Sequence, residues 1–319
     1  MNIIETHALS RVYGKRRAVD SLDMRVAAGE IYGFVGKNGA GKSTAMKMIA
    51  GLVRPTSGSV ELFGAQRRAR EGFSRVGALI EDPGILPTFS ALENLMCKAL
   101  ALGVVRPNAH CRELLELVGL ADTGSLRVKK FSLGMKQRLG LALALVGGPD
   151  LLLLDEPFNG LDPESTRAMR GALVRLNRER GVTMVISSHV LDQLDRMATS
   201  FGVIRSGRMV RELSMDDLHR ECGNSIRIRT NDPARTLAIL EEALPGTALR
   251  AEPDGSILAS AAVRHAATSF GGAAADPMAP SAEDVARPLT DHGQLILELS
   301  HLERDIEEYF VELMGGADA

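Results

Sequence analysis

Gly36-Lys37-Asn38-Gly39-Ala40-Gly41-Lys42-Ser43-Thr44 is the stretch of sequence that decides the fold. It fits the pattern G-x-x-x-x-G-K-[ST], in which a glycine-rich loop between a buried strand and a helix cradles phosphate groups. The apolar run 31–35 before it and the helix-forming run 45–50 after it supply this context. The pattern therefore predicts a nucleotide site in an α/β core, against the alternative of an ordinary glycine-rich turn with a surface lysine.

Each residue type in this loop has its own predicted task. Gly36, Gly39 and Gly41 allow backbone angles that a Cβ would exclude, so successive amide N–H groups can turn towards a phosphate at the positive end of the helix. Lys42 would reach the β- and γ-phosphates, and Ser43 would place its hydroxyl on Mg²⁺. The other residues predicted to bind ATP in this loop are Asn38, Ala40 and Thr44.

Length, charge and cysteine content limit the class of protein. A chain of 319 residues favours two domains, and a net charge of -2 argues against a nucleic-acid binder that acts through bulk positive charge. Three cysteines without a C-x-x-C pair suit a reducing cytoplasm. The sequence shows no signal peptide and no apolar run near the roughly 18 residues of a membrane span. We therefore expect any transport function to need a separate membrane chain.

A second group of candidate residues follows two predicted core strands. Four leucines at 151–154 predict a strand buried on both faces, and Asp155 and Glu156 end it. Asp155 can hold Mg²⁺ through water, whereas Glu156 can polarise the water that attacks the γ-phosphate. His189 ends the predicted strand 182–188. A lone histidine is more often structural, but this position faces the ligand edge of such sheets.

Two further residues each have a structural and a functional interpretation. Tyr13 lies in a predicted antiparallel strand, where its ring could pack on the sheet or offer a flat face to an adenine. Ser132 begins a predicted helix and is expected to cap it, which is compatible with anion binding at the same helix start.

The rest of the chain is organised around this core. Residues 1–30 predict antiparallel strands, 59–63 a short strand, 76–80 a core strand, and 90–128 a helical insert. From residue 225 a smaller α+β pattern follows, with strands at 225–230, 248–251, 256–260 and 294–299, helices at 233–244 and 301–314, and a flexible loop rich in alanine, glycine and proline at 261–281. We therefore expect an ATPase domain at 1–220 and an accessory domain at 221–319.

In this order, the phosphate loop, the Ser132 motif, the Asp155-Glu156 pair and His189 resemble the ATP-binding subunit of an ABC transporter over about residues 2–220. The resemblance implies an α/β P-loop NTPase core with an antiparallel β subdomain and a helical signature subdomain, followed here by a small C-terminal α+β domain. It also implies that Tyr13 stacks on adenine and that His189 is a switch residue near the γ-phosphate.

The resemblance further implies how two copies work together. Ser132 and Gly134 would contact the γ-phosphate held by the other subunit, and Asp162 would lie at the dimer seam. A head-to-tail homodimer would then bind two ATP molecules and, on the inner face of the cell membrane, move a separate permease docked near the loop after Glu81. No nucleic-acid partner is expected.

Two departures from the family pattern point to a branch. Glu81 stands where the family usually has glutamine, and residues 131–135 read Phe-Ser-Leu-Gly-Met in place of Leu-Ser-Gly-Gly-Gln. Glu81 could still approach Mg²⁺, at the cost of added negative charge. Residues 80–84 and 132–138 resemble the bacitracin-resistance and lantibiotic-immunity branch. Residues 302–310 resemble the C-terminal domain of drug-exporting ATPases, or form an ordinary amphipathic helix.

The leading hypothesis is an ATPase that powers export of an antimicrobial peptide or hydrophobic drug. Export of another lipid or natural product is the alternative among transporters. A soluble ABC ATPase acting on DNA or ribosomes would use the same site, but such proteins tend to carry a long coiled coil or two ATPase units. A P-loop kinase is a third alternative, and it would not need the Ser132 motif.

Overall fold

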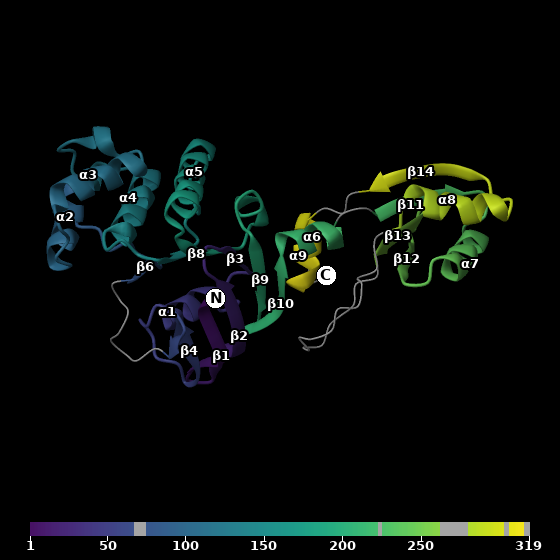
Figure 1. Cartoon of the computed structure of the whole chain (residues 1–319), viewed down its shortest axis with the longest axis horizontal. Coiled ribbons are helices and arrows are strands. Elements are labelled where there is room, and N and C mark those ends of the chain that lie inside the picture. Colours follow the sequence, from purple (N-terminus) through teal and green to yellow (C-terminus); the bar gives the residue numbers. More distant parts are fainter. Residues whose placement is uncertain (67–74, 223–224, 262–279, 303–305, 316–319) are drawn as a thin grey trace. The chain divides into compact units, whose positions relative to one another are not determined.

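The computed structural model describes residues 1–66, 75–222, 225–261, 280–302 and 306–315 (Figure 1). The chain divides into two compact units. The first comprises Met1–Leu213 with Leu313–Ala319, and the second comprises Ser214–Glu312. The domain division expected between residues 220 and 221 remains a prediction.

A six-stranded sheet forms the core of the first unit, in the order β10-β9-β3-β8-β7-β6. Its strands are β3 (Ile31–Val35), β6 (Val76–Leu79), β7 (Leu151–Asp155), β8 (Thr183–Ser188), β9 (Ser200–Arg205) and β10 (Arg208–Ser214). The pairings from β9 to β6 are parallel. Val35 pairs with Ser188 and Asp155 with Ser187, so β3, β7 and β8 end together at one edge. This edge positions the predicted site.

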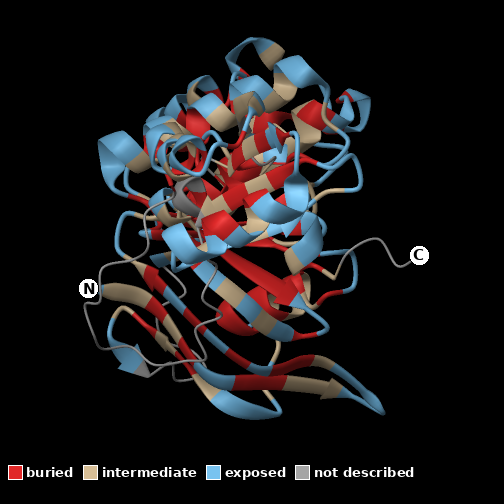
Figure 2. Ribbon diagram, turned by 90° about the vertical axis from the view of Figure 1, so that its right-hand side faces the viewer, coloured by how far each residue is buried: buried red, intermediate tan, exposed pale blue. Residues whose placement is uncertain are grey.

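A four-stranded antiparallel sheet, ordered β2-β1-β4-β5, lies in the same unit. Its strands are β1 (Asn2–Tyr13), β2 (Arg16–Ala27), β4 (Ser57–Leu62) and β5 (Ala65–Gln66). One apolar core joins the two sheets through α1 (Lys42–Ile49): Met46 and Ile49 pack in one cluster with Leu22 of β2, Phe34 of β3 and Leu153 of β7. In Figure 2 the buried residues (red) follow the strands, while the outer helix faces are exposed.

Four helices of the first unit lie on one side of β6 and β8 in Figure 1. They are α2 (Ala91–Ala101), α3 (Pro107–Leu117), α4 (Leu133–Leu145) and α5 (Pro163–Arg180), with short 3₁₀ turns at Ala121–Thr123, Val128–Lys130 and Leu191–Gln193. The Ser90 hydroxyl accepts from the Glu93 amide, and the Glu93 carboxylate accepts from the Ser90 amide, which caps α2 reciprocally. The predicted helical insert is therefore confirmed.

The second unit is a smaller α+β body. It contains α6 (Met215–Cys222), β11 (Ser225–Thr230), α7 (Pro233–Ala243), β12 (Thr247–Ala251), β13 (Ile257–Ala261), α8 (Ala282–Asp291), β14 (Ile296–Leu302) and α9 (Ile306–Leu313). The strands form one antiparallel sheet, β12-β13-β11-β14. Ile226 and Ile228 of β11 pack with Leu240 of α7 and Leu289 of α8. With the core of the first unit and this smaller α+β body, the predicted α/β fold class is confirmed.

The C-terminal predictions need two corrections. Residues 301 and 302, predicted to begin a helix, instead end β14, because its pairing with β11 as far as Leu302 overrides the helical pattern there. The described part of the predicted helix is α9, and residues 303–305 lie outside the described residues. The helix α8 was not predicted. The loop predicted at 261–281 lies, for residues 262–279, outside the described residues. Among the helices that the structure describes, none combines the length and apolar character needed to cross a bilayer.

A hydrogen-bonded pair on the core sheet, formed by the buried Tyr32 of β3 and the more exposed Glu212 of β10, makes stability depend on pH. The Tyr32 hydroxyl donates to Glu212 Oε1 at 2.6 Å, and burial is the main cause that raises the pKa of the Glu212 carboxyl. A raised pKa means that the folded state binds this proton more tightly than the unfolded state does, so the stabilisation is lost as pH rises through the folded-state pKa.

We therefore expect Glu212→Gln, which keeps an oxygen acceptor for Tyr32, to gain thermal stability relative to the unchanged protein as pH rises above the ordinary range of a glutamate. The relative gain should be small, because Glu212 is largely exposed and solvent screens its charge. Thermal unfolding of both proteins from pH 4 to pH 8 measures it. A difference in Tm that is constant over this range would contradict the account.

Candidate functional site

The phosphate-loop pattern forms the predicted strand–loop–helix, from β3 to the start of α1. Gly39 and Gly41 have φ values of 79° and 116°, in the left-handed region that favours glycine. A Cβ on Gly41 would lie 2.5 Å from the Ala18 carbonyl oxygen, and a Cβ on Gly36 would lie 2.5 Å from that of Ile204. The loop is therefore pressed against neighbouring backbone and needs glycine at these positions.

Lys42 lies inside this loop and is 5% exposed. Its Nζ donates to the Gly36 carbonyl oxygen at 2.6 Å and lies 3.2 Å from Glu156 Oε1. The ammonium group is thus held between the loop and the end of β7, where phosphate oxygens could replace the backbone acceptor. In the rest of the loop Asn38 is exposed, Ala40 buried, and Ser43 and Thr44 half-buried.

Asp155 and Glu156 stand at the carboxyl end of β7, as predicted. Ser187 of β8 connects them, because its hydroxyl donates to Asp155 Oδ1 at 2.6 Å and accepts from the Glu156 amide at 2.9 Å. Glu156 has a φ of 48°, which is uncommon for a residue with a side chain. Backbone strain of this kind occurs at functional sites where the surroundings enforce it.

His189 follows β8 and reaches the same carboxylate. Its Nδ1 lies 2.7 Å from Glu156 Oε2, while Lys42 contacts Oε1. Glu156 therefore joins Lys42 and His189, three residues that the sequence places far apart. The Glu156 side chain is 19% exposed, so water retains access to it.

A cleft of about 370 Å³ opens beside these carboxylates. Its lining residues are Glu81, Leu133, Gln137, Asp155, Glu156, Asn159 and Gly160. The exposed Glu81 lies in the left-handed region with a φ of 61°, and its Oε1 is 2.5 Å from Lys47 Nζ on α1. The cleft thus brings Glu81, the β7 carboxylates and the start of α4 to one place.

Ser132 and Asp162 cap two neighbouring helices. The Ser132 hydroxyl accepts from the Met135 amide at 3.2 Å, which confirms the predicted N-cap of α4. Asp162 accepts from the Ser165 amide at 2.8 Å to cap α5, and the hydrogen bonds from Ser165 lower the pKa of the Asp162 carboxyl. A Cβ on Gly134 would lie 3.0 Å from the Ser165 hydroxyl oxygen, so the two helix starts pack closely. Ser132 and Asp162 both face solvent.

Tyr13 ends β1 and its side chain is 43% exposed. The Arg11 guanidinium lies 4.5 Å from the centre of its ring. The ring is thus not buried against the sheet, and a flat aromatic surface remains partly accessible.

Sequence reasoning missed two residues of this site. Ser187 was assigned only to a strand, although a serine at the carboxyl end of a core strand is placed to hold a neighbouring carboxylate. Lys47 was assigned only to a helix. It lies four residues after Ser43, on the same face of α1, and this spacing was the signal that its ammonium group could reach a carboxylate near the nucleotide site, as it does with Glu81.

The residues present fit a magnesium nucleotide. The glycine loop offers a cradle that side chains would fill, and Lys42 supplies a buried positive charge. The Ser43 hydroxyl and the Asp155 carboxylate are oxygen donors of the kind that Mg²⁺ prefers.

Comparison with known proteins relates this site to a family. Residues 19–159 match the family model described as ABC transporter. The bacitracin transport ATP-binding protein BcrA of Bacillus licheniformis is 35% identical over 316 residues, which cover 98% of this chain and 98% of that protein. The lantibiotic transport ATP-binding protein SrtF of Streptococcus pyogenes is 38% identical over 214 residues, covering 67% of this chain and 92% of that protein.

A solved structure shows the same fold. The ATP-binding cassette MJ0796, described as a dimer in a post-hydrolysis state bound to ADP and Pi, superimposes with a TM-score of 0.61 at 22% identity, covering 66% of this chain and 98% of that chain. With the near full-length similarity to BcrA, the chain belongs to the ATP-binding proteins of the ABC transporter family, which bind and hydrolyse ATP.

Proposed function

We propose that this ATPase powers export of an antimicrobial peptide of the bacitracin or lantibiotic kind, or of a hydrophobic drug, through a separate membrane permease. The observation that carries the proposal is the similarity to BcrA over 98% of both chains, which extends beyond the ATPase unit into the C-terminal unit. Shared ATPase residues alone would be expected in any member of the family. Similarity that includes the C-terminal unit favours the same kind of transport as in BcrA.

We assign hydrolysis to the contacts around Glu156. The Glu156 carboxylate would accept a proton from the attacking water. His189, whose Nδ1 lies 2.7 Å from Glu156 Oε2, would orient this carboxylate and stabilise the γ-phosphate. Lys42 would leave the Gly36 carbonyl oxygen for the β- and γ-phosphates, because a charge-assisted contact with phosphate is stronger than a contact with a neutral carbonyl.

Mg²⁺ is the proposed cofactor. Ser43 and Asp155 would hold it, with Glu81 as a further carboxylate at the cleft, and the ion would neutralise charge on the transferring phosphate. Ser187 would orient Asp155 through their 2.6 Å hydrogen bond. Lys47 would offset the negative charge that Glu81 adds to this site.

Two copies would share each nucleotide. The exposed Ser132 and the buried Gly134 lie at the N-terminal end of α4, where amide groups and the helix dipole favour an anion, so they would contact the γ-phosphate held by the second copy. Asp162, at the adjacent start of α5, would lie at the seam between copies, and Tyr13 would stack on the adenine. Because ATP would contact both copies only when they are closed, binding would shift the population to the closed dimer.

Ser132→Arg tests this arrangement. A long cationic side chain at the start of α4 should block closure on the partner's nucleotide, abolish the ATP-dependent dimer and lower ATP hydrolysis on the order of 10²-fold. Ser132→Thr keeps a capping hydroxyl and is the matched control, with activity near that of the unchanged protein. Light scattering with and without ATP measures the dimer. An arginine variant that dimerises normally would remove Ser132 from the shared site.

The two parts of the chain would have different tasks in this scheme. We propose that residues 1–220 form the nucleotide-binding domain and residues 221–319 an accessory domain. The chain would sit in the cytoplasm on the inner face of the cell membrane, with the permease docked near the loop after Glu81. No nucleic acid is proposed as a partner.

Copurification separates this function from the alternatives. Tagged protein is purified from mild-detergent extracts of its own cells, with and without ATP, and its companions are identified. The proposal predicts a polytopic membrane protein, and resistance assays on cells lacking that partner then distinguish a peptide or drug from another lipid or natural product. Ribosomal or DNA-bound partners without a membrane protein would favour a soluble ABC ATPase and contradict the proposal.

A further inference from the structure

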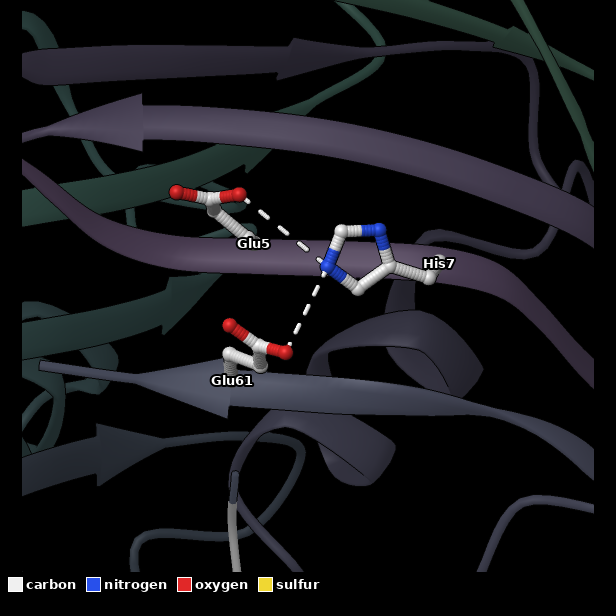
Figure 3. Close-up of side chains that lie close together, drawn as sticks. All are labelled: Glu5, His7 and Glu61. Atoms are coloured by element: carbon white, nitrogen blue, oxygen red, sulfur yellow. Dashed lines mark ion pairs between the residues drawn. The ribbon is translucent and has the colours of Figure 1, made fainter. Parts of the chain in front are cut away.

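Three metal-ligating side chains gather on the antiparallel sheet, apart from the nucleotide site. Glu5 and His7 lie two residues apart on β1, and Glu61 lies on the neighbouring strand β4 (Figure 3). Successive side chains of a strand alternate between the two faces of the sheet, so Glu5 and His7 share a face. Glu61 joins them because it pairs directly with Glu5 in the β1–β4 register.

The pairing of Glu5 with Glu61 is electrostatically unfavourable by itself. Like charges placed directly opposite each other on adjacent strands destabilise a sheet. His7 Nε2 lies between the two carboxylates, 4.0 Å from Glu5 Oε2 and 3.7 Å from Glu61 Oε1. Figure 3 shows all three groups converging on one point. A positive charge at this point would relieve the repulsion.

Glu5 is already oriented towards that point. The Asn2 side-chain amide donates to Glu5 Oε1 at 3.0 Å, while Glu5 Oε2 faces His7. Supporting hydrogen bonds of this kind, which fix one oxygen of a carboxylate and leave the other available, accompany metal ligands in proteins. The other two side chains, His7 at 47% exposure and Glu61 at 37%, are free enough to adjust and open enough for an ion to enter.

We propose that Glu5, His7 and Glu61 bind a divalent transition-metal ion, with Zn²⁺ as the reference ion. One imidazole and two carboxylates are ligands that Zn²⁺ accepts, with water in the fourth position. Tetrahedral ligands about 2.1 Å from zinc are separated by roughly 3.4 Å. The three ligand atoms here lie within 4.8 Å of one another, so small side-chain rotations complete the geometry.

The bound ion would join β1 to β4. Strand β1 pairs with both β2 and β4, and it ends at Tyr13. Because the site forms only when these strands pair, the ion stabilises the folded sheet through binding linkage. The site does not depend on the nucleotide-binding residues.

Zinc binding to the metal-stripped full-length protein tests the proposal. Titration calorimetry at pH 7.5, where free histidine is mostly neutral, gives the number of zinc ions bound per chain. His7→Asn and Glu61→Gln should each lose one equivalent of high-affinity zinc and the rise of several degrees in Tm that zinc gives the unchanged protein. His292→Asn is the matched control, since this exposed histidine contacts the Pro288 carbonyl oxygen and should bind zinc as before.

Cobalt gives an independent readout of the ligands. Co²⁺ added to the unchanged protein should produce visible absorption bands that both variants lack. Without zinc or cobalt, the variants should unfold within a few degrees of the unchanged protein. With Mg²⁺ supplied for the assay they should keep its ATPase rate, which shows that they fold. Equal zinc stoichiometry in all four proteins would overturn the proposal.

Discussion

Glu156→Gln is expected to lower the ATP hydrolysis rate by about 10²–10⁴-fold, the usual contribution of a positioned general base. The amide keeps the shape of the side chain at the end of β7 but cannot take a proton from water. ATP should still bind, because the glycine loop and Lys42 remain in place. The variant should therefore accumulate as a long-lived ATP-bound dimer, measurable by size-exclusion chromatography with light scattering and by phosphate release.

The matched control is Glu164→Gln, which neutralises an exposed carboxylate in the first turn of α5 and should hydrolyse ATP at the normal rate. A Glu156→Gln protein with normal turnover would show that the water is activated by another group, even though His189 and Lys42 both contact this carboxylate.

Lys42→Ala should weaken ATP binding by roughly 10–100-fold, since a hydrogen bond to a charged group contributes about 1.5–3 kcal/mol. In the structure the Lys42 ammonium bonds to the Gly36 carbonyl oxygen and neighbours Glu156. Removing it would leave the phosphates without their closest positive charge and leave the Glu156 carboxylate unneutralised. Fluorescence titration with a labelled ATP analogue measures the affinity.

Lys47→Ala, in the same helix, is the control for this prediction. Lys47 pairs with Glu81 at the cleft, so its loss is expected to change ATP affinity far less than the loss of Lys42. Equal affinities of the unchanged and Lys42→Ala proteins would remove the phosphate loop from the mechanism.

Much of the first unit could be predicted because several local signals agree there. The predicted core strands, β3, β6, β7 and β8, are apolar runs that end in turn or polar residues, and burial on both faces leaves few other structures open to them. The candidate site follows from the parallel topology. Since parallel strands end at the same edge, the phosphate loop, Glu156 and His189 are brought together although they are far apart in the chain.

The remaining errors have identifiable physical causes. The sequence signal for α8 is weakened by Pro288 inside the helix, although the Ser281–Asp284 capping box marked its start. At the C-terminus, long-range pairing of β14 with β11 decided where the strand ended, and no local pattern reports such pairing. The contact of Lys47 with Glu81 and that of Ser187 with Asp155 likewise depend on which elements become neighbours.

The central claim is that hydrolysis at the Lys42–Glu156–His189 site powers export of an antimicrobial compound. The most direct measurement is growth inhibition by bacitracin, a lantibiotic and an anthracycline, in cells that lack this protein and carry either the unchanged chain or Glu156→Gln. We predict that the unchanged chain raises the inhibitory concentration of at least one compound and that Glu156→Gln, made in equal amount, does not. Equal protection by both chains would contradict a role for ATP hydrolysis, and no protection by either would contradict export of these compounds.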